Sequence, residues 1–240
     1  MFRIAFRGAF AAAGLALSSA GVGAAAPPPR PAPFAPIQAT ADGLSNWGGY
    51  IAPGTSGEFT TASADWTVPA VTCLAKRNLY APWVGIDGDG DDTVEQTGVA
   101  TSCRTGSPVE SAWYEMYPSA PVYYSNPISA GDGIVASVTS KAVAGGTKFT
   151  LTISDTTQGW TETVNRTPSE SPSRLSAEAV IESPNASYPQ IPAVTFTNVL
   201  FNSQDLSTFS PLKSATGDKG VVYRAGKITH RDDFTISPNT

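Results

Sequence analysis

The 240-residue sequence has one histidine (His230), two cysteines (Cys73 and Cys103) and few charged residues, only 15% in all. Hydrolases of the Ser-His-Asp or Cys-His type need an imidazole to carry the proton, and a single histidine in an irregular tail is a poor candidate for that role. One histidine and two cysteines are also too few ligands for a structural zinc site. The chain is acidic, with a net charge of −5, whereas nucleic-acid-binding proteins carry a basic surface. We therefore expect no metal, no cofactor and no nucleic-acid partner.

Long apolar runs are absent after residue 26. Residues 1–26 combine the basic Arg3 and Arg7 with an apolar run over 8–17 and small residues at 24–26, which is the pattern of a secretory signal peptide. An uncleaved membrane anchor is disfavoured because the run is shorter than the roughly 20 residues that span a bilayer. We expect a secreted protein, a monomer that leaves the membrane once the signal is removed.

Residues 27–41 are rich in proline and alanine, which favours an extended segment over a folded element. The sequence leaves open whether this segment is a linker or a propeptide. The remaining residues, 42–240, are enough for a single β-sandwich domain.

The cysteine pair predicts a disulfide, because exported proteins with an even number of cysteines commonly pair them. Closing the loop between Cys73 and Cys103 stabilises a fold by roughly 3 to 4 kcal/mol on the chain-entropy model. A reactive thiol is the alternative, but the chain offers no credible base to activate it.

No amphipathic helix of ordinary length follows residue 42, whereas strand patterns recur between Gly-, Pro-, Asn- and Asp-rich turns. The predicted strands are 58–68, 80–86, 93–98, 109–117, 133–139, 148–153, 159–164, 174–182 and 193–197. Many short strands of this kind predict an all-β, antiparallel β-sandwich or jelly roll. The tail from residue 206 to 240 is the least patterned part, with a predicted hairpin through 221–223 and 227–229 and a last strand at 234–236.

The stretch from Tyr80 to Thr97 predicts two strands joined by an acidic, glycine-rich turn. Alternate side chains on a strand share a face, so Trp83 and Asp87 point the same way on the incoming strand, and we expect Gln96 beside them on the returning one. The alternating aspartates of this turn resemble the start of an EF-hand loop. However, Asp92 stands where that loop needs glycine, which favours a solvated turn over a calcium site.

Two later stretches extend the same pattern. Trp113 and Glu115 share one face of a predicted strand, and Glu178 and Glu182 share one face of another. The opposite face of the second strand consists of core-type residues: Ala177, Ala179 and Ile181. These alternations predict a sheet whose exposed face carries tryptophan, glutamine and glutamate.

Four motifs in this order are similar to those of the glutamic peptidases, or eqolisins. They are Trp-Val-Gly-Ile-Asp-Gly from Trp83, Glu-Gln-Thr-Gly from Glu95, Ala-Trp-Tyr-Glu-Met-Tyr-Pro from Ala112, and Ala-Glu-Ala-Val-Ile-Glu from Ala177. The resemblance extends from Asn46 to about Asn198. It implies two packed antiparallel sheets, one curved into a substrate groove, and an acid endopeptidase that acts on polypeptides without a cofactor.

The resemblance places a catalytic dyad at Gln96 and Glu182. Peptide hydrolysis needs a base for the water, a donor for the oxyanion and an acid for the leaving nitrogen. A glutamate can serve as base and then as acid, and a neutral amide can hold the water and stabilise the oxyanion. Glu178 is the neighbour most easily confused with Glu182.

Further positions match the family in or near its groove: Trp47, Trp83, Asp87, Trp113 and Glu115. Tryptophans supply flat walls for an extended peptide, and Asp87 or Glu115 would tune the base by like-charge repulsion. The sequence departs from the family at Ala179, where a large aromatic residue is usual. Ala179 faces away from Glu182 by strand parity, so we expect altered packing and intact catalysis.

Two other functions fit an aromatic groove. One is a jelly-roll glycoside hydrolase that uses Glu115 and Glu182 as its carboxylate pair, and the other is a non-catalytic carbohydrate-binding sandwich. Neither requires Gln96. The resemblance and a glutamate base imply an acidic optimum for the peptidase. A surface with few charges gains little positive charge in acid, which suits an acidic medium.

Overall fold

The computed structural model describes residues 33–40, 43–218 and 220–239. The predicted signal peptide, residues 1–26, lies outside the described residues, as do 27–32 of the predicted linker or propeptide. None of the helical segments in the described part of the chain has the length and apolar character to cross a membrane.

The described chain is built almost wholly from β-strands, and the one other regular element is a 3₁₀ turn, Leu206–Phe209. The strands are β1 (Trp47–Pro53), β2 (Thr61–Thr67), β3 (Leu79–Ile86), β4 (Val94–Ser102), β5 (Val109–Tyr117), β6 (Val122–Tyr123), β7 (Gly133–Val143), β8 (Gly146–Asp155), β9 (Trp160–Arg166), β10 (Ser176–Glu182), β11 (Val194–Phe201), β12 (Gln204–Asp205), β13 (Leu212–Asp218), β14 (Val221–Ala225) and β15 (Phe234–Asn239). All nine strands predicted between residues 58 and 197 are present, with shifted ends.

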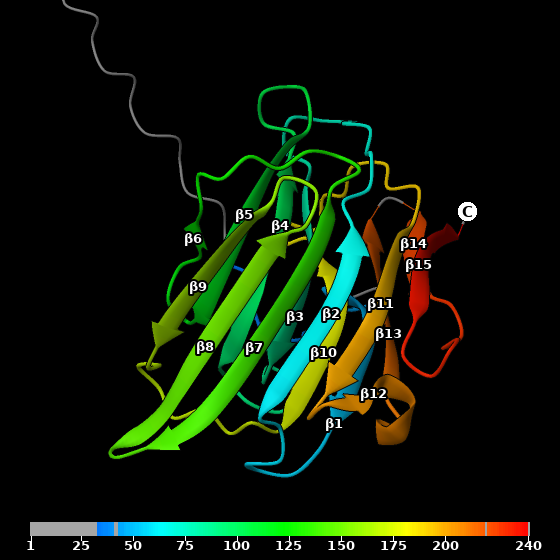
Figure 1. The fold of residues 1–240 in the computed structure, drawn as a ribbon. Helices are drawn as coiled ribbons and strands as arrows, with labels where there is room; N and C mark the ends of the chain where they lie inside the picture. The colour runs from blue at the N-terminus through cyan, green and yellow to red at the C-terminus, as the bar shows by residue number, and fades with distance from the viewer. Residues whose placement is uncertain (1–32, 41–42, 219, 240) are drawn as a thin grey trace, which may run out of the picture. The chain divides into compact units, whose positions relative to one another are not determined.

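Two antiparallel layers are arranged as a sandwich (Figure 1). The first sheet has the order β6-β5-β4-β3-β10-β1 and the second β14-β15-β11-β2-β7-β8-β9. The strand β13 joins them, because residues 212–214 pair with β1 and residues 215–218 pair with β14. The predicted all-β antiparallel sandwich is therefore confirmed.

The main core lies between the two sheets. Buried and less buried residues alternate along β7 and β8, so one face of the second sheet packs inward and the other faces solvent. The inward face of β10 consists of Ala177, Ala179 and Ile181, as predicted, and all three join this core. Ala179 therefore lies on the face of β10 opposite Glu182.

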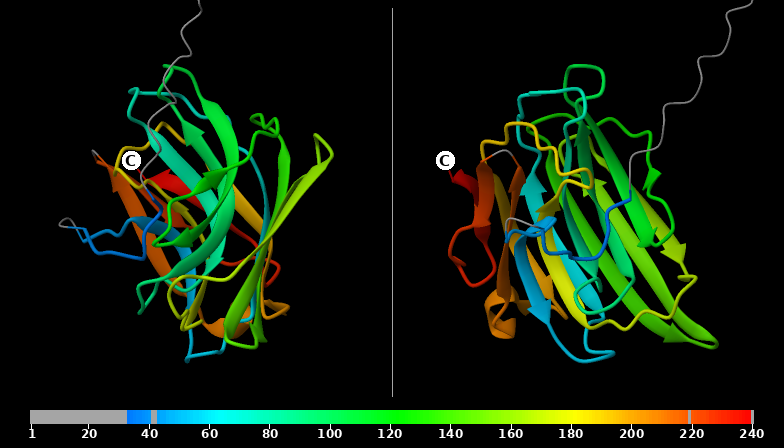
Figure 2. Two further views of the ribbon diagram at one scale, coloured as in Figure 1. Left: turned by 90° about the vertical axis from the view of Figure 1, so that its left-hand side faces the viewer. Right: turned by 180° about the vertical axis from the view of Figure 1, so that it is seen from behind.

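The prediction that the outer face of the first sheet is exposed is wrong. Gln96 and Glu115 have 0% exposed surface and Glu182 has 1%. A second apolar cluster, which includes Trp47, Trp83 and Trp113, covers this face together with the segment of residues 33–38. This segment, part of the blue trace, crosses the outer face of the first sheet (Figure 2). Burial arises because the chain's own N-terminal segment occupies the groove.

The predicted tail hairpin is also wrong. The strand β14 pairs with β13 and β15, while residues 227–229 lie outside the strands. The last strand was predicted correctly at 234–236 and extends to Asn239. Four strands were not predicted: the two-residue strands β6 and β12, and the longer β1 and β13. The strand β1 contains the Gly48-Gly49 pair, and glycine weakens a strand pattern.

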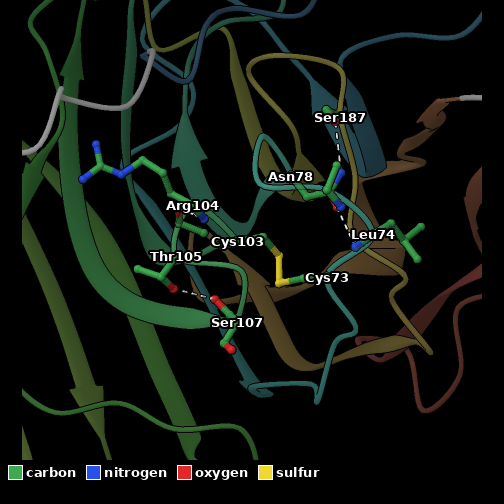
Figure 3. Close-up of a disulfide and its surroundings, with 10 residues drawn as sticks. Cys73, Leu74, Asn78, Cys103, Arg104, Thr105, Ser107 and Ser187 are labelled. Atoms are coloured by element: carbon green, nitrogen blue, oxygen red, sulfur yellow. Dashed lines mark hydrogen bonds between the residues drawn. A yellow bond between two sulfur atoms is a disulfide. The ribbon is translucent and has the colours of Figure 1, made fainter.

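The predicted disulfide between Cys73 and Cys103 is confirmed (Figure 3). It joins the loop before β3 to the end of β4. Beside it, the buried side chain of Asn78 accepts from the backbone N–H of Leu74 at 2.8 Å and donates to Ser187 Oγ at 3.0 Å. The bridge and this network together fix the ends of the two strands that carry Trp83 and Gln96.

Candidate active site

Strand register places Gln96 in a row of residues on the outer face of the first sheet. Gln96 lies opposite Glu115 on β5 and Gly85 on β3, and Gly85 in turn lies opposite Glu178 on β10. A Cβ atom at Gly85 would lie 2.8 Å from the Trp83 ring and 3.2 Å from Gln96 Cβ. The absence of a side chain at Gly85 therefore leaves room for Gln96. Glu182 lies further along β10, opposite Trp47 on β1.

Glu115 holds the Gln96 amide. Its Oε2 accepts a hydrogen bond from Gln96 Nε2 at 3.1 Å and another from the backbone N–H of Phe34 at 3.0 Å. Burial raises the pKa of Glu115 to about 9, the bond from Phe34 lowers it in part, and the charge of Glu182 raises it further. With Oε2 as acceptor, the amide nitrogen of Gln96 is aimed into the groove.

Glu182 is surrounded by hydrogen-bond donors. Its Oε1 accepts from Asn46 Nδ2 at 3.1 Å and from the backbone N–H of Ala35 at 3.2 Å, and its Oε2 accepts from Trp47 Nε1 at 3.1 Å. Burial raises the pKa of Glu182 to about 8, although these donors, which favour the charged form, oppose the shift. The carboxyl group is therefore held in one orientation and has a high affinity for a proton.

One peptide unit of the chain contacts both Gln96 and Glu182. The carbonyl oxygen of Phe34 accepts from Gln96 Nε2 at 2.7 Å, and the next N–H, that of Ala35, donates to Glu182. The carbonyl oxygen of Ala35 accepts from Trp47 Nε1 at 3.0 Å. Side chains at predicted site positions thus bind consecutive backbone groups of an extended peptide.

Aromatic rings and the β3–β4 turn hold the rest of the segment. The ring of Phe34 stacks on Trp113 with centroids 4.3 Å apart and planes inclined by 13°. Further along, the N–H of Ile37 donates to the carbonyl of Gly88 at 2.9 Å. The groove continues past Ile37 into a hollow of about 1060 Å³ whose lining includes Asp91 and Glu170. It is therefore long enough for a peptide to extend beyond the segment.

Asp87 lies apart from this group. Its carboxylate accepts from the backbone N–H groups of Arg174 and Leu175, both at 2.7 Å, and among the described residues no hydrogen bond joins it to the Gln96–Glu182 group. Burial raises the pKa of Asp87 to about 7, although the bond from Arg174 opposes the shift. Asp87 braces the loop that leads into β10.

Glu178 also differs from its neighbour Glu182. Its carboxyl group is fully buried, and among the described residues no donor of the segment 33–38 reaches either of its oxygens. The register alone, with both glutamates on one face of β10, does not separate them. The contacts do, because the segment of residues 33–38 binds Glu182.

The sequence reasoning missed two residues of the site. Asn46 donates to Glu182 and to the carbonyl oxygens of Ala35 and Pro36. The available signal was its place at the start of the stretch that resembles the glutamic peptidases. Phe34 was missed because it lies in the Pro/Ala-rich segment, where it is the one aromatic residue between 27 and 41.

Comparisons with known proteins identify the family. The model of the Peptidase A4 family matches residues 45–224. The curated protein aspergillopepsin-2 of Aspergillus niger is 30% identical over 182 residues, which cover 64% of this chain and 63% of that protein. This chain therefore spans less than two thirds of the length of that relative.

Solved structures show the same fold. Scytalido-glutamic peptidase, crystallised with a transition-state analogue inhibitor, superposes with a TM-score of 0.66 at 26% identity over 85% of this chain and 100% of that one. Aspergilloglutamic peptidase from Aspergillus niger superposes with a TM-score of 0.54 at 25% identity over 68% of this chain and 99% of that one.

Proposed function

The chain belongs to the Peptidase A4 family of glutamic peptidases, and we propose that it is a secreted acid endopeptidase in which Glu182 activates water and Gln96 stabilises the oxyanion. The observation that supports this proposal most directly is the peptide unit between Phe34 and Ala35. Its carbonyl oxygen accepts a hydrogen bond from Gln96, and its N–H donates to Glu182. These are the atoms that gain negative charge and a proton, respectively, when a peptide bond is hydrolysed.

In this mechanism Glu182 takes a proton from water as the water attacks the carbonyl carbon. The developing oxyanion accepts a hydrogen bond from Gln96, and Glu115 keeps that amide oriented. Glu182 then gives the proton to the leaving nitrogen. The steps use these side chains and water.

Asn46 and Trp47 position the base. Both donate to the Glu182 carboxyl group, one to each oxygen, and both also donate to the carbonyl of Ala35. They therefore couple the orientation of Glu182 to the presence of a peptide in the groove, which is the arrangement that pre-organises a catalytic group.

Family membership favours the peptidase over the glycoside hydrolase and the carbohydrate-binding sandwich. Both alternatives leave Gln96 without a role, whereas here Gln96 donates to a peptide carbonyl and to Glu115.

Secretion is proposed from the signal-like residues 1–26. It predicts that the protein is recovered from the culture medium without these residues, as a monomer in size-exclusion chromatography.

The test is digestion of an acid-denatured protein between about pH 2 and 8 by the full chain after incubation in acid. The parent should cleave in acid. Gln96→Ala should lose about 10² to 10³ in kcat, the usual effect of removing one oxyanion donor, and Glu182→Gln should lose activity altogether. Glu178→Gln is the matched control, since it makes the same change on the same face of β10.

The proposal is wrong if folded Gln96→Ala keeps full activity, if Glu178→Gln is as inactive as Glu182→Gln, or if activity peaks above neutral pH. Circular dichroism of each variant separates loss of catalysis from loss of fold.

A further inference from the structure

We propose that Thr216 and Ser214 of β13 are positioning residues of the active site, whose hydroxyl groups hold the backbone from which Asn46 and Trp47 reach Glu182. This inference rests on the proposed peptidase function and extends it to a strand outside the groove. In the described structure both hydroxyl groups bind backbone carbonyls, and neither forms a hydrogen bond with the segment of residues 33–38.

The path of β13 brings side chains to this place. Backbone pairing between β1 and β13 ends at Gly49 and Ser214, and from residue 215 onward β13 pairs with β14 of the second sheet. The strand therefore turns away from β1 beside residues 45–47. Hydroxyl groups of β13 bind the backbone there, at the carbonyls of Asn46 and Trp47.

Thr216 holds the carbonyl of Asn46. Its Oγ1 lies 3.2 Å from that carbonyl oxygen and 2.7 Å from the hydroxyl oxygen of Tyr188. The Tyr188 hydroxyl is farther from the carbonyl, at 3.4 Å, so the favoured arrangement is that Tyr188 donates to Thr216 and Thr216 donates to Asn46. Thr216 and Tyr188 are buried, so water is a poor substitute for either bond.

Gly48 fixes the orientation of Thr216. A Cβ atom at Gly48 would lie 2.7 Å from Thr216 Cγ2, so the methyl group of Thr216 fills the space above this glycine. With the methyl group held there, the hydroxyl group is directed at the carbonyl of Asn46.

Ser214 holds the next carbonyl, that of Trp47. Its Oγ lies 2.8 Å from the carbonyl oxygen and 2.6 Å from Ser45 Oγ. Ser45 Oγ lies 2.6 Å from the same carbonyl oxygen and accepts from the N–H of Trp47 at 3.1 Å. Because each hydroxyl group has one proton, one serine donates to the carbonyl while the other donates to its partner. Two serines thus fix this carbonyl.

The two carbonyls belong to the peptide units on either side of the Trp47 Cα, so both units are fixed in orientation. The indole N–H of Trp47 donates to Glu182 Oε2, and the side-chain amide of Asn46 donates to Oε1, each at 3.1 Å. A rotation of either peptide unit would carry these donors away from the carboxyl group. Thr216 and Ser214 therefore act on Glu182 through Asn46 and Trp47.

These bonds differ from the other contacts of Asn46 in what they depend on. The Asn46 side chain also binds the carbonyl oxygens of Ala35 and Pro36 and the N–H of Gln38, all on the segment in the groove. The bond to Thr216 lies within the fold and does not depend on what the groove contains. It is therefore suited to pre-organise the donors before a substrate binds.

The test compares Thr216→Val, which removes the hydroxyl group and keeps the shape, with Thr216→Ser, which keeps the hydroxyl group. Steady-state kinetics of the full chain on an acid-denatured protein give kcat, KM and the pH dependence of kcat/KM. Thr216→Val should lower kcat about tenfold, the size expected for misplaced catalytic groups, with KM within about twofold of the parent. Thr216→Ser should restore most of kcat.

The pH profile separates positioning from a general loss of stability. Burial raises the pKa of Glu182, and the bonds from Asn46 and Trp47 oppose this shift. A looser hold on these donors raises the pKa further, so the acidic limb of kcat/KM should move to higher pH in Thr216→Val. The ionisable groups beside Glu182, those of Glu115 and Tyr188, are unchanged in this variant.

Two further variants complete the test. Ser140→Ala is the matched control, because its buried hydroxyl contacts the backbone carbonyls of Phe59 and Thr60 at 3.5 and 3.4 Å, away from the groove. It should lose stability and keep kcat and the pH profile. Replacing Ser45 and Ser214 together by alanine tests the carbonyl of Trp47. Both serines are half-buried, so this double variant should fold even if Thr216→Val does not, and kcat should fall while the acidic limb moves to higher pH.

Outcomes separate the two proposals. Positioning by β13 is overturned, and the peptidase function stands, if the parent digests the protein while the folded Thr216→Val and the double serine variant keep the kcat and pH profile of the parent. The same holds if Thr216→Ser is as impaired as Thr216→Val, since the hydroxyl group is then not the cause. If Thr216→Val does not fold, the double serine variant alone decides. If the parent itself is inactive in acid, the peptidase function fails, and this inference with it.

Discussion

The space beside Gln96 exists because residue 85 has no side chain. The Cβ of an alanine there would lie 2.8 Å from the Trp83 ring and 3.2 Å from Gln96 Cβ, closer than packed atoms tolerate. We predict that Gly85→Ala displaces the Gln96 amide and lowers kcat by about tenfold to a hundredfold, since small misplacements of catalytic groups have effects of this size.

Steady-state kinetics in acid would check this prediction, with Gly133→Ala as control. A Cβ at Gly133 would lie equally close, 2.8 Å, to Thr156 Oγ1, but on the second sheet. Both variants should lose stability, and only Gly85→Ala should lose kcat. Equal kcat for the two would show that Gln96 does not depend on the space at residue 85.

A second prediction for a single residue concerns Glu178. Burial raises its pKa well above the ordinary value, and the neighbouring Ser176 hydroxyl opposes this shift only in part. Glu178→Gln should therefore raise the free energy of unfolding at pH 7.5, where the unfolded chain gains from ionising Glu178, and change it less at pH 4. Urea unfolding at both pH values measures the difference. A lower stability at pH 7.5 than the parent would contradict the prediction.

Individual residues also show how far the sequence alone could reach. Gln96 and Glu182 were predicted from the family motifs and strand parity, and the structure brings both to one peptide unit, while their catalytic roles stay predictions. Asp87 shares the parity of Trp83, yet it follows the end of β3 with a positive φ of 73°, which turns its carboxylate toward the loop at Arg174. Parity does not extend past the last residue of a strand, so the sequence could not place Asp87.

At the scale of elements, strands in which apolar and polar residues alternate clearly were predicted, and strands without this alternation were missed. The strand β1 carries Trp47 but also two glycines, and a Cβ at Gly49 would collide with the backbone of Ala179. Close approach of β10 requires glycine there, and glycine removes the pattern by which a strand is found. The strand β13 was missed for another reason: it pairs with a different sheet in each half, so its residues follow no single inward face.

The disulfide links two elements of the first sheet, and its removal gives a prediction for them. Replacing Cys73 and Cys103 together by alanine should lower the free energy of unfolding by roughly 3 to 4 kcal/mol, since the bridge spans 30 residues. The folded double variant should keep its kcat, because Gln96 lies on β4 well before Cys103. Urea unfolding of parent and variant, with and without reductant, measures the effect. A parent that is unaffected by complete reduction would contradict it.

The sequence could not predict that a segment of the chain covers the groove, and the reason again concerns a single element. Segment 33–38 contains two prolines and no alternation, so its composition indicates only an extended chain. Its binding depends on backbone groups that meet Gln96, Glu115 and Glu182, and these contacts become visible only when the strands are assembled.

For the whole molecule, buried carboxyl groups determine how stability depends on pH. In the folded protein burial raises their pKa values: Asp87 to about 7, Glu182 to about 8, Glu115 to about 9, and Glu95 and Glu178 well above the ordinary value. In the unfolded chain the same groups titrate near pH 4. Between about pH 4.5 and 9 the folded state therefore binds more protons than the unfolded state, so stability falls as pH rises.

We predict that the free energy of unfolding is highest near pH 4 and falls by an amount on the order of several kcal/mol by pH 8, with a limit of about 1.4 kcal/mol per pH unit for each such group. Urea unfolding at pH 4, 6 and 8 measures this slope. A slope that is flat or rises with pH would show that these carboxyl groups ionise in the folded protein at ordinary pH.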